Sequence, residues 1–162
     1  MSASKQRDSS LDGSVRVPSW AASLTMEEAV PRSLECTSIE VRIVDTKLID
    51  SHTKYFVRVS YGVKSWAVER RFTDFYYLDK ELRDTFPNIK IPPLPPKRYI
   101  LSSNDPRFVD ERKEQLEIYL KALVTISHVW STNHLVLFLD DESGSMMFIW
   151  NFERMRKIQD VK

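Results

Sequence analysis

Residues 70–75, with the sequence RRFTDF, constrain the fold most strongly, because the hydrophobic period changes there. The run from Trp66 to Phe72 reads as a strand, whereas Phe75, Leu78, Leu82 and Phe86 recur at the spacing of a helix. A strand that passes directly into a helix places two arginines and an aromatic ring at the junction. The sequence therefore predicts basic side chains at the junction between a sheet and a helix.

Two earlier segments also have strand character. Ile39, Val41 and Ile43 occupy every second position of the first, and the second, residues 55–61, is rich in β-branched and aromatic side chains. Gly62 follows the second run as a turn residue. Three short strands with short connections predict an antiparallel meander.

Helical patterns dominate the chain after the junction. Thr73 is the predicted N-cap of the first helix, with Asp74 favourably placed in its first turn, and Pro87 ends it. Asp105 and Pro106 predict the N-cap and first position of the longest helix, which extends to about residue 127. Further helices are predicted over residues 131–140 and, after Gly144, over 146–158.

Between the first two helices, residues 91–96 are too rich in proline for a helix and should run as a polyproline II arm. The expected fold class is therefore α+β: a three-stranded antiparallel β-meander packed against a helical subdomain, with a polyproline II arm. Residues 1–33 are predicted to form a flexible N-terminal tail, residues 34–142 the domain, and residues 143–162 an amphipathic helical extension. Packing of this extension on the domain is favoured over binding to a partner or a membrane.

Composition argues against several classes of protein function. A net charge of +1 over 162 residues argues against a nucleic-acid binder, so any basic site must be local. Cys36 is the only cysteine, which excludes a disulfide framework. No apolar run approaches the roughly 18 residues that span a bilayer, and the N-terminus has no signal-like stretch. We expect a cytoplasmic protein that meets membranes only from the surface.

An enzyme is not expected. The three histidines show no metal-ligand spacing, and no nucleophile elbow or phosphate-binding glycine loop is present. No cofactor or metal is predicted.

Arg112 stands out because it falls on the apolar stripe of the longest helix. Arginine is almost never fully buried without a partner. It must form a salt bridge, for which Asp74 or Asp79 could serve, cap carbonyl groups, or face a pocket. Helical periodicity alone leaves these three alternatives open.

Arg70 and Arg71 point to opposite faces of a regular strand, and parity does not say which faces a pocket. Two adjacent arginines are commonly a solvated edge. Phe72 favours a binding role, because an aromatic ring can support a flat ligand while a guanidinium holds a phosphate with two hydrogen bonds. Lys97 and Arg98 add basic charge directly after the proline arm.

The order of elements and the residues Arg71, Phe72, Lys97 and Arg112 resemble the PX (phox-homology) domain, a phosphoinositide-binding module of sorting nexins, over about residues 36–142. The resemblance implies that Arg71 binds the 3-phosphate, that Phe72 stacks under the inositol ring, that Lys97 contacts the 1-phosphate, and that Arg112 holds the 4- and 5-hydroxyls. Phe72 stands where tyrosine is commoner in the family, and Thr73 where serine is. The implied ligand is phosphatidylinositol 3-phosphate on early endosomal membranes, with trafficking-complex proteins as further partners. Arg70 and Arg98 would be auxiliary basic residues.

Tyr99, Ile100 and Leu101 follow the basic pair. Three exposed bulky side chains are unfavourable unless they pack on the domain or insert into a membrane. Beside a lipid headgroup site we expect insertion, with packing as the alternative.

A protein-interaction module is the competing hypothesis. Residues 93–98, PLPPKR, fit the P-x-x-P-x-R pattern of Src-homology-3 ligands. If the proline arm is packed into the fold, it cannot bind such a domain without opening.

Overall fold

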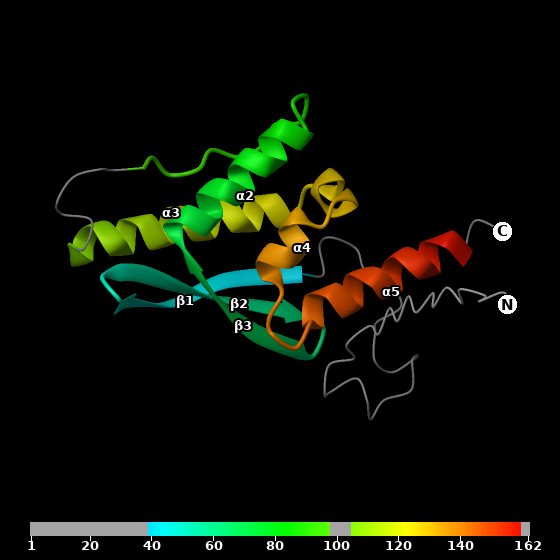
Figure 1. Ribbon diagram of the computed structural model, residues 1–162, viewed down its shortest axis with the longest axis horizontal. Coiled ribbons are helices and arrows are strands. Elements are labelled where there is room, and N and C mark those ends of the chain that lie inside the picture. Colours follow the sequence, from blue (N-terminus) through cyan, green and yellow to red (C-terminus); the bar gives the residue numbers. More distant parts are fainter. Residues whose placement is uncertain (1–38, 98–104, 160–162) are drawn as a thin grey trace, which may run out of the picture.

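The computed structural model describes residues 39–97 and 105–159. Its sheet consists of β1 (Ile39–Ile49), β2 (His52–Tyr61) and β3 (Lys64–Arg71), which pair antiparallel in the order β1-β2-β3. The helices lie against this sheet and to one side of it (Figure 1). The predicted meander and the α+β class are confirmed.

The sheet buries one face because its apolar residues alternate along each strand. On β1, Ile39, Val41 and Ile43 are buried, whereas their neighbours are exposed. The β1–β2 register shifts between Ile43 and Asp45, which marks a bulge. The amide of Ile43 donates to Oε2 of Glu117, at 2.8 Å. The sheet is therefore joined to the helix that covers it by this hydrogen bond as well as by apolar packing.

The helical part contains four α-helices and a short 3-10 helix among the described residues. Their bounds are α2 (Phe72–Thr85), α3 (Pro106–Val124), η2 (Ser127–Ser131), α4 (His134–Leu139) and α5 (Ser145–Gln159). The predicted helix over residues 131–140 is therefore shorter than expected, because the 3-10 turn of η2 precedes it and α4 begins only at His134.

The two predicted helix starts had different outcomes. Asp105 caps α3 as expected: its Oδ1 accepts from the amide of Arg107 at 3.0 Å, and Pro106 is the first helical residue. Thr73 is not the N-cap of α2, and that prediction was wrong. The helix begins at Phe72, so Arg71 occupies the cap position. The Asp74 carboxylate accepts from the Arg71 amide at 2.6 Å, which satisfies one N–H at the helix start.

The helix α5 joins the same hydrophobic core through Met146, Ile149 and Trp150, which are all buried. The Trp150 indole also donates to the carbonyl of Trp130 at 2.9 Å. Beyond this contact the helix extends away from the sheet (Figure 1). The first turns of the predicted extension thus pack on the domain.

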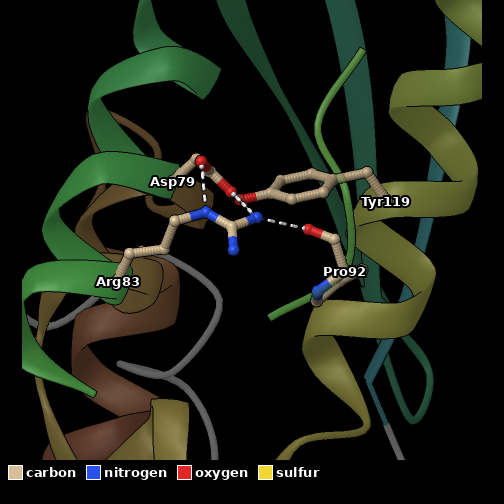
Figure 2. A network of polar contacts seen from close by, with 4 residues as sticks. All are labelled: Asp79, Arg83, Pro92 and Tyr119. Carbon is tan, nitrogen blue, oxygen red and sulfur yellow. Dashed lines mark hydrogen bonds and ion pairs between the residues drawn. The ribbon is translucent and has the colours of Figure 1, made fainter. Parts of the chain in front are cut away.

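The proline arm, residues 91–96, is neither helix nor strand and lies in the segment between α2 and α3. Figure 2 shows the polar network that holds it. Arg83 of α2 donates to the carbonyl of Pro92 at 2.8 Å and pairs with Asp79, whose carboxylate also accepts from the Tyr119 hydroxyl of α3 at 3.1 Å. Burial, with the nearby Asp79 charge, raises the pKa of Tyr119 well above its usual range. Arg83 therefore anchors the arm to α2, and Asp79 and Tyr119 connect this anchor to α3.

Candidate functional site

A small cavity opens where β3 passes into α2, with a volume of about 150 Å³. Three of the residues singled out in the sequence meet there: Arg71 at the end of β3, Phe72 at the start of α2, and Arg112 on α3. The β1–β2 hairpin supplies the rest of the wall. The complete lining is Ser51, His52, Thr53, Tyr55, Arg71, Phe72, Thr73 and Arg112.

Arg112 is held in a fixed position although only 8% of its surface is exposed. Its guanidinium carbon lies 4.2 Å from the ring centroid of Phe72 and 4.2 Å from that of Phe108. Its Nη2 donates to the carbonyl of Pro96 at 3.3 Å. Two rings and the arm therefore fix a cation at the cavity wall. Because the guanidinium is largely shielded from water there, its attraction for an anion is stronger than at an exposed site.

Of the three alternatives for Arg112, carbonyl capping and a place at a pocket are both observed. The two carboxylates considered as salt-bridge partners are engaged elsewhere. Asp74 accepts from the Arg71 amide, and Asp79 from Arg83 and Tyr119.

Tyr55 lies under the cavity with 1% of its surface exposed. Burial raises the pKa of its phenol, and the charge and hydrogen bond of Arg112 oppose that rise. The phenol therefore remains neutral at physiological pH, and the net charge of the cavity wall is set by its arginines.

Arg71 and Arg70 diverge as strand parity requires. Arg71 lines the cavity, whereas the Arg70 guanidinium lies against the C-terminal end of α4. There Arg70 donates from Nε to the carbonyl of Phe138 at 2.9 Å and from Nη2 to that of Asp140 at 3.0 Å. Arg70 is thus occupied as a C-terminal cap of a helix 68 residues away, outside the cavity.

Lys97, in contrast, does not line the cavity. Lys97 is exposed, and its Nζ lies 5.7 Å from the ring centroid of Tyr76 on α2. Arg98, Tyr99, Ile100 and Leu101 lie outside the described residues, so their predicted roles stay predictions.

Sequence reasoning missed the contribution of the β1–β2 hairpin. Its turn residues Asp50 and Ser51 have φ values of 49° and 64°, the left-handed region that matches a tight hairpin. This turn brings His52 and Thr53 to the cavity. Asp followed by Ser between two strand patterns was the available signal, since both are common turn residues.

No helix in the parts of the chain that the structure describes is long and apolar enough to cross a bilayer. No group of three or more metal-ligating side chains was found among those residues.

The meander, the arm between α2 and α3 and the basic cavity at the strand–helix junction define a small α+β domain of the PX type. The family profile of the PX domain matches residues 58–142, slightly more than half of the chain. The chain belongs to the PX domain family. PX domains in general are non-catalytic modules that bind phosphoinositide lipids and act in trafficking.

Curated relatives include kinase-like proteins and sorting nexins. The PX domain-containing protein kinase-like protein of Rattus norvegicus is 36% identical over 101 residues, which are 60% of this chain and 17% of the relative. Sorting nexin-16 of Mus musculus is 36% identical over 85 residues, 50% of this chain and 24% of the relative. The match therefore spans less than a quarter of these relatives.

Among solved structures, a designed CISK-PX domain has a TM-score of 0.59 and 34% identity. The alignment covers 63% of this chain and 99% of that domain. The likeness thus extends over an entire PX domain.

Proposed function

We propose that this chain binds phosphatidylinositol 3-phosphate and is recruited by it, as a peripheral protein, to early endosomal membranes in protein sorting and transport. One observation carries the proposal: the fold unites Arg71, Phe72 and Arg112 around a single cavity. These residues lie up to 41 positions apart in the chain, and the residue resemblance assigns all three to the lipid headgroup.

The chemistry of each side chain suits its proposed role. A phosphomonoester carries about −1.5 to −2 charges and three strong acceptors at neutral pH. Arg71 can hold such a group with two parallel hydrogen bonds, which a lysine cannot do. We assign Arg71 to the 3-phosphate, Lys97 to the 1-phosphate, and Phe72 to the platform under the ring.

Selectivity for one ring phosphate follows from Arg112. The rings of Phe72 and Phe108 hold its guanidinium rigidly, so it cannot retreat from a bulkier substituent. Hydroxyls at positions 4 and 5 fit against it, whereas a 5-phosphate would crowd this side. The volume of about 150 Å³ also favours one small headgroup over a drug-sized ligand.

Vesicle sedimentation with the seven phosphoinositides tests the proposal. We expect selective binding to the 3-phosphate, and Arg71→Gln should weaken it by about tenfold to a hundredfold through loss of a charge-assisted contact. Arg58→Gln is the matched control, because Arg58 is exposed on the open face of β2, away from the cavity. Equal effects of the two substitutions would refute the assignment of Arg71.

Membrane insertion by Tyr99, Ile100 and Leu101 is a second part of the proposal. Complete burial of Ile100 or Leu101 would contribute roughly 1.5–3 kcal/mol each. The double variant Ile100→Ala/Leu101→Ala should weaken vesicle binding and leave binding of a soluble short-chain lipid unchanged. If both affinities fall together, these residues pack on the domain and do not insert.

The competing Src-homology-3 hypothesis meets an obstacle in the packing of the arm. Such domains bind a polyproline II segment in a groove lined by aromatic side chains, so the segment must be accessible. Pro95 is buried, and the carbonyls of Pro92 and Pro96 accept hydrogen bonds from Arg83 and Arg112. A synthetic peptide of residues 90–101 compared with the whole chain measures the cost of this packing. Equal affinity for a Src-homology-3 domain would favour the interaction module.

A further inference from the structure

We propose that His52 is a further headgroup-binding residue, whose imidazolium donates to a phosphate of the lipid and strengthens binding as the pH falls. The inference rests on the proposed lipid-binding function and extends it to a residue of the β1–β2 hairpin. His52 lines the same cavity as Arg71, Phe72 and Arg112. It is exposed at the rim, where a ligand can reach it.

The hairpin turn orients the imidazole ring. Nδ1 of His52 lies 2.6 Å from the carbonyl oxygen of Asp50. A carbonyl oxygen only accepts, so Nδ1 must carry the proton. Nε2 is then the nitrogen available to a ligand, and it can donate to a phosphate only in the protonated, cationic ring.

The positive φ values of Asp50 and Ser51 show why this geometry is specific to the turn. Residues other than glycine enter the left-handed region at a cost, and aspartate is among the side chains that tolerate it best. The hydrogen bond from His52 to Asp50 closes this unfavourable turn. The turn therefore presents the imidazole in a defined orientation beside the arginines.

The charges around His52 couple its protonation to the ligand. Arg71 and Arg112 share the cavity wall with it. Tyr55 lies beneath as a neutral phenol, Asp50 belongs to the turn, and Asp110 of α3 borders the adjacent cavity with Thr53. A bound phosphate brings about −1.5 to −2 charges into the cavity, and this negative charge attracts an imidazolium. Proton uptake by His52 should therefore accompany lipid binding.

Two opposing pH effects must be separated. The phosphomonoester has its own second ionisation near pH 6, so its negative charge decreases on acidification, and binding by the arginines weakens. An imidazolium acts in the opposite direction. Comparing the chain with His52→Gln cancels the first effect, because glutamine can donate a hydrogen bond but carries no charge at any pH.

The experiment measures binding to vesicles of phosphatidylcholine with and without 5% phosphatidylinositol 3-phosphate, between about pH 7.5 and about pH 5.5. The affinity ratio of the chain to His52→Gln should rise by about threefold to tenfold over this range, the size of one charge-assisted contact. His128→Gln, an exposed histidine on η2 remote from the cavity, should leave the ratio near one at every pH.

A second measurement guards against a loosened hairpin in the variant. Proton–carbon NMR of the His52 ring in the unsubstituted chain should show its titration midpoint moving to higher pH when soluble short-chain phosphatidylinositol 3-phosphate is added. Inorganic phosphate serves as the parallel arm and should produce a smaller shift, because it lacks the ring contacts.

The outcomes separate the two proposals. A ratio independent of pH, with an unmoved NMR midpoint and intact binding to 3-phosphate vesicles, would overturn the role of His52 alone. Absence of wild-type binding to those vesicles at every pH would overturn the lipid assignment and the role of His52 with it.

Discussion

Arg70 and Arg71 are adjacent and chemically identical, yet the structure predicts opposite consequences when each is replaced by alanine. Arg70→Ala should destabilise the fold and leave the lipid affinity of the folded chain unchanged. Arg71→Ala should leave the stability nearly unchanged and weaken lipid binding by about tenfold to a hundredfold. The contrast arises because Arg70 serves the end of α4, whereas Arg71 lines the cavity.

The magnitude for Arg70 follows from its hydrogen bonds. Its guanidinium donates to the carbonyls of Phe138 at 2.9 Å, Asp140 at 3.0 Å and Leu137 at 3.3 Å. Burial lowers the pKa of Arg70, and the charges of Asp74 and Asp140 oppose that change. A net hydrogen bond to a charged donor contributes about 1.5–3 kcal/mol, and bonds that share one group are not additive. Because the site is only partly buried, we expect a loss of about 3–4 kcal/mol in the free energy of unfolding.

Urea denaturation monitored by tryptophan fluorescence measures this loss, since Trp66 donates to the carbonyl of Leu139 at the same helix end. Arg70→Lys, which keeps the charge but loses the fork, should fall between alanine and the unsubstituted chain. Vesicle binding per folded molecule is measured in parallel. An unchanged denaturation midpoint for Arg70→Ala, or a loss of lipid affinity equal to that of Arg71→Ala, would refute the reasoning.

Three further predictions follow from other contacts. Arg112→Ala should lower the free energy of unfolding by about 2–4 kcal/mol, because it removes two ring contacts and the hydrogen bond to the arm. It should also weaken lipid binding. An unchanged free energy of unfolding in urea denaturation would contradict this prediction. Burial raises the pKa of Glu117, but the hydrogen bonds from Lys121 and the Ile43 amide outweigh it and hold the pKa below its ordinary value. The stability that this carboxylate contributes is therefore present above about pH 4.3 and is lost as the pH falls through the lowered pKa. The difference in the free energy of unfolding between the chain and Glu117→Gln should shrink between about pH 5 and pH 3. A difference that stays constant over this range would contradict the role of Glu117. Thr73 is exposed in the first turn of α2, and Thr73→Glu should weaken vesicle binding by about tenfold relative to Thr73→Gln, because the carboxylate competes with the lipid phosphate for Arg71. The melting temperature should not fall, because a negative charge near the helix start interacts favourably with the helix dipole. Equal vesicle affinities of the two variants would show that a charge at this position does not affect binding in the cavity.

Local patterns in the sequence determined much of this domain. Alternation along residues 39–43 predicted the first strand, because a half-buried sheet requires a period of two, and the β-branched and aromatic side chains of residues 55–61 predicted the second. Asp105 and Pro106 predicted the start of α3, because an N-cap and a first-position proline act within one turn of the chain. The position of Arg112 on an apolar stripe already indicated a buried cation with special partners.

The tertiary structure alone decided what those partners are. Nothing near Arg70 in the sequence reveals that carbonyls 67 to 70 residues away would take its guanidinium. Strand parity separates Arg70 from Arg71, but only the placement of α4 determines which of them is left to face the cavity. Likewise, His52 reaches the site because a turn with two left-handed residues folds β2 back beside β1, and this places His52 at the cavity that Arg112 of α3 also lines. Helix and strand periods depend on neighbours a few residues apart, whereas a binding site depends on distances between elements, which are set by packing across the whole core.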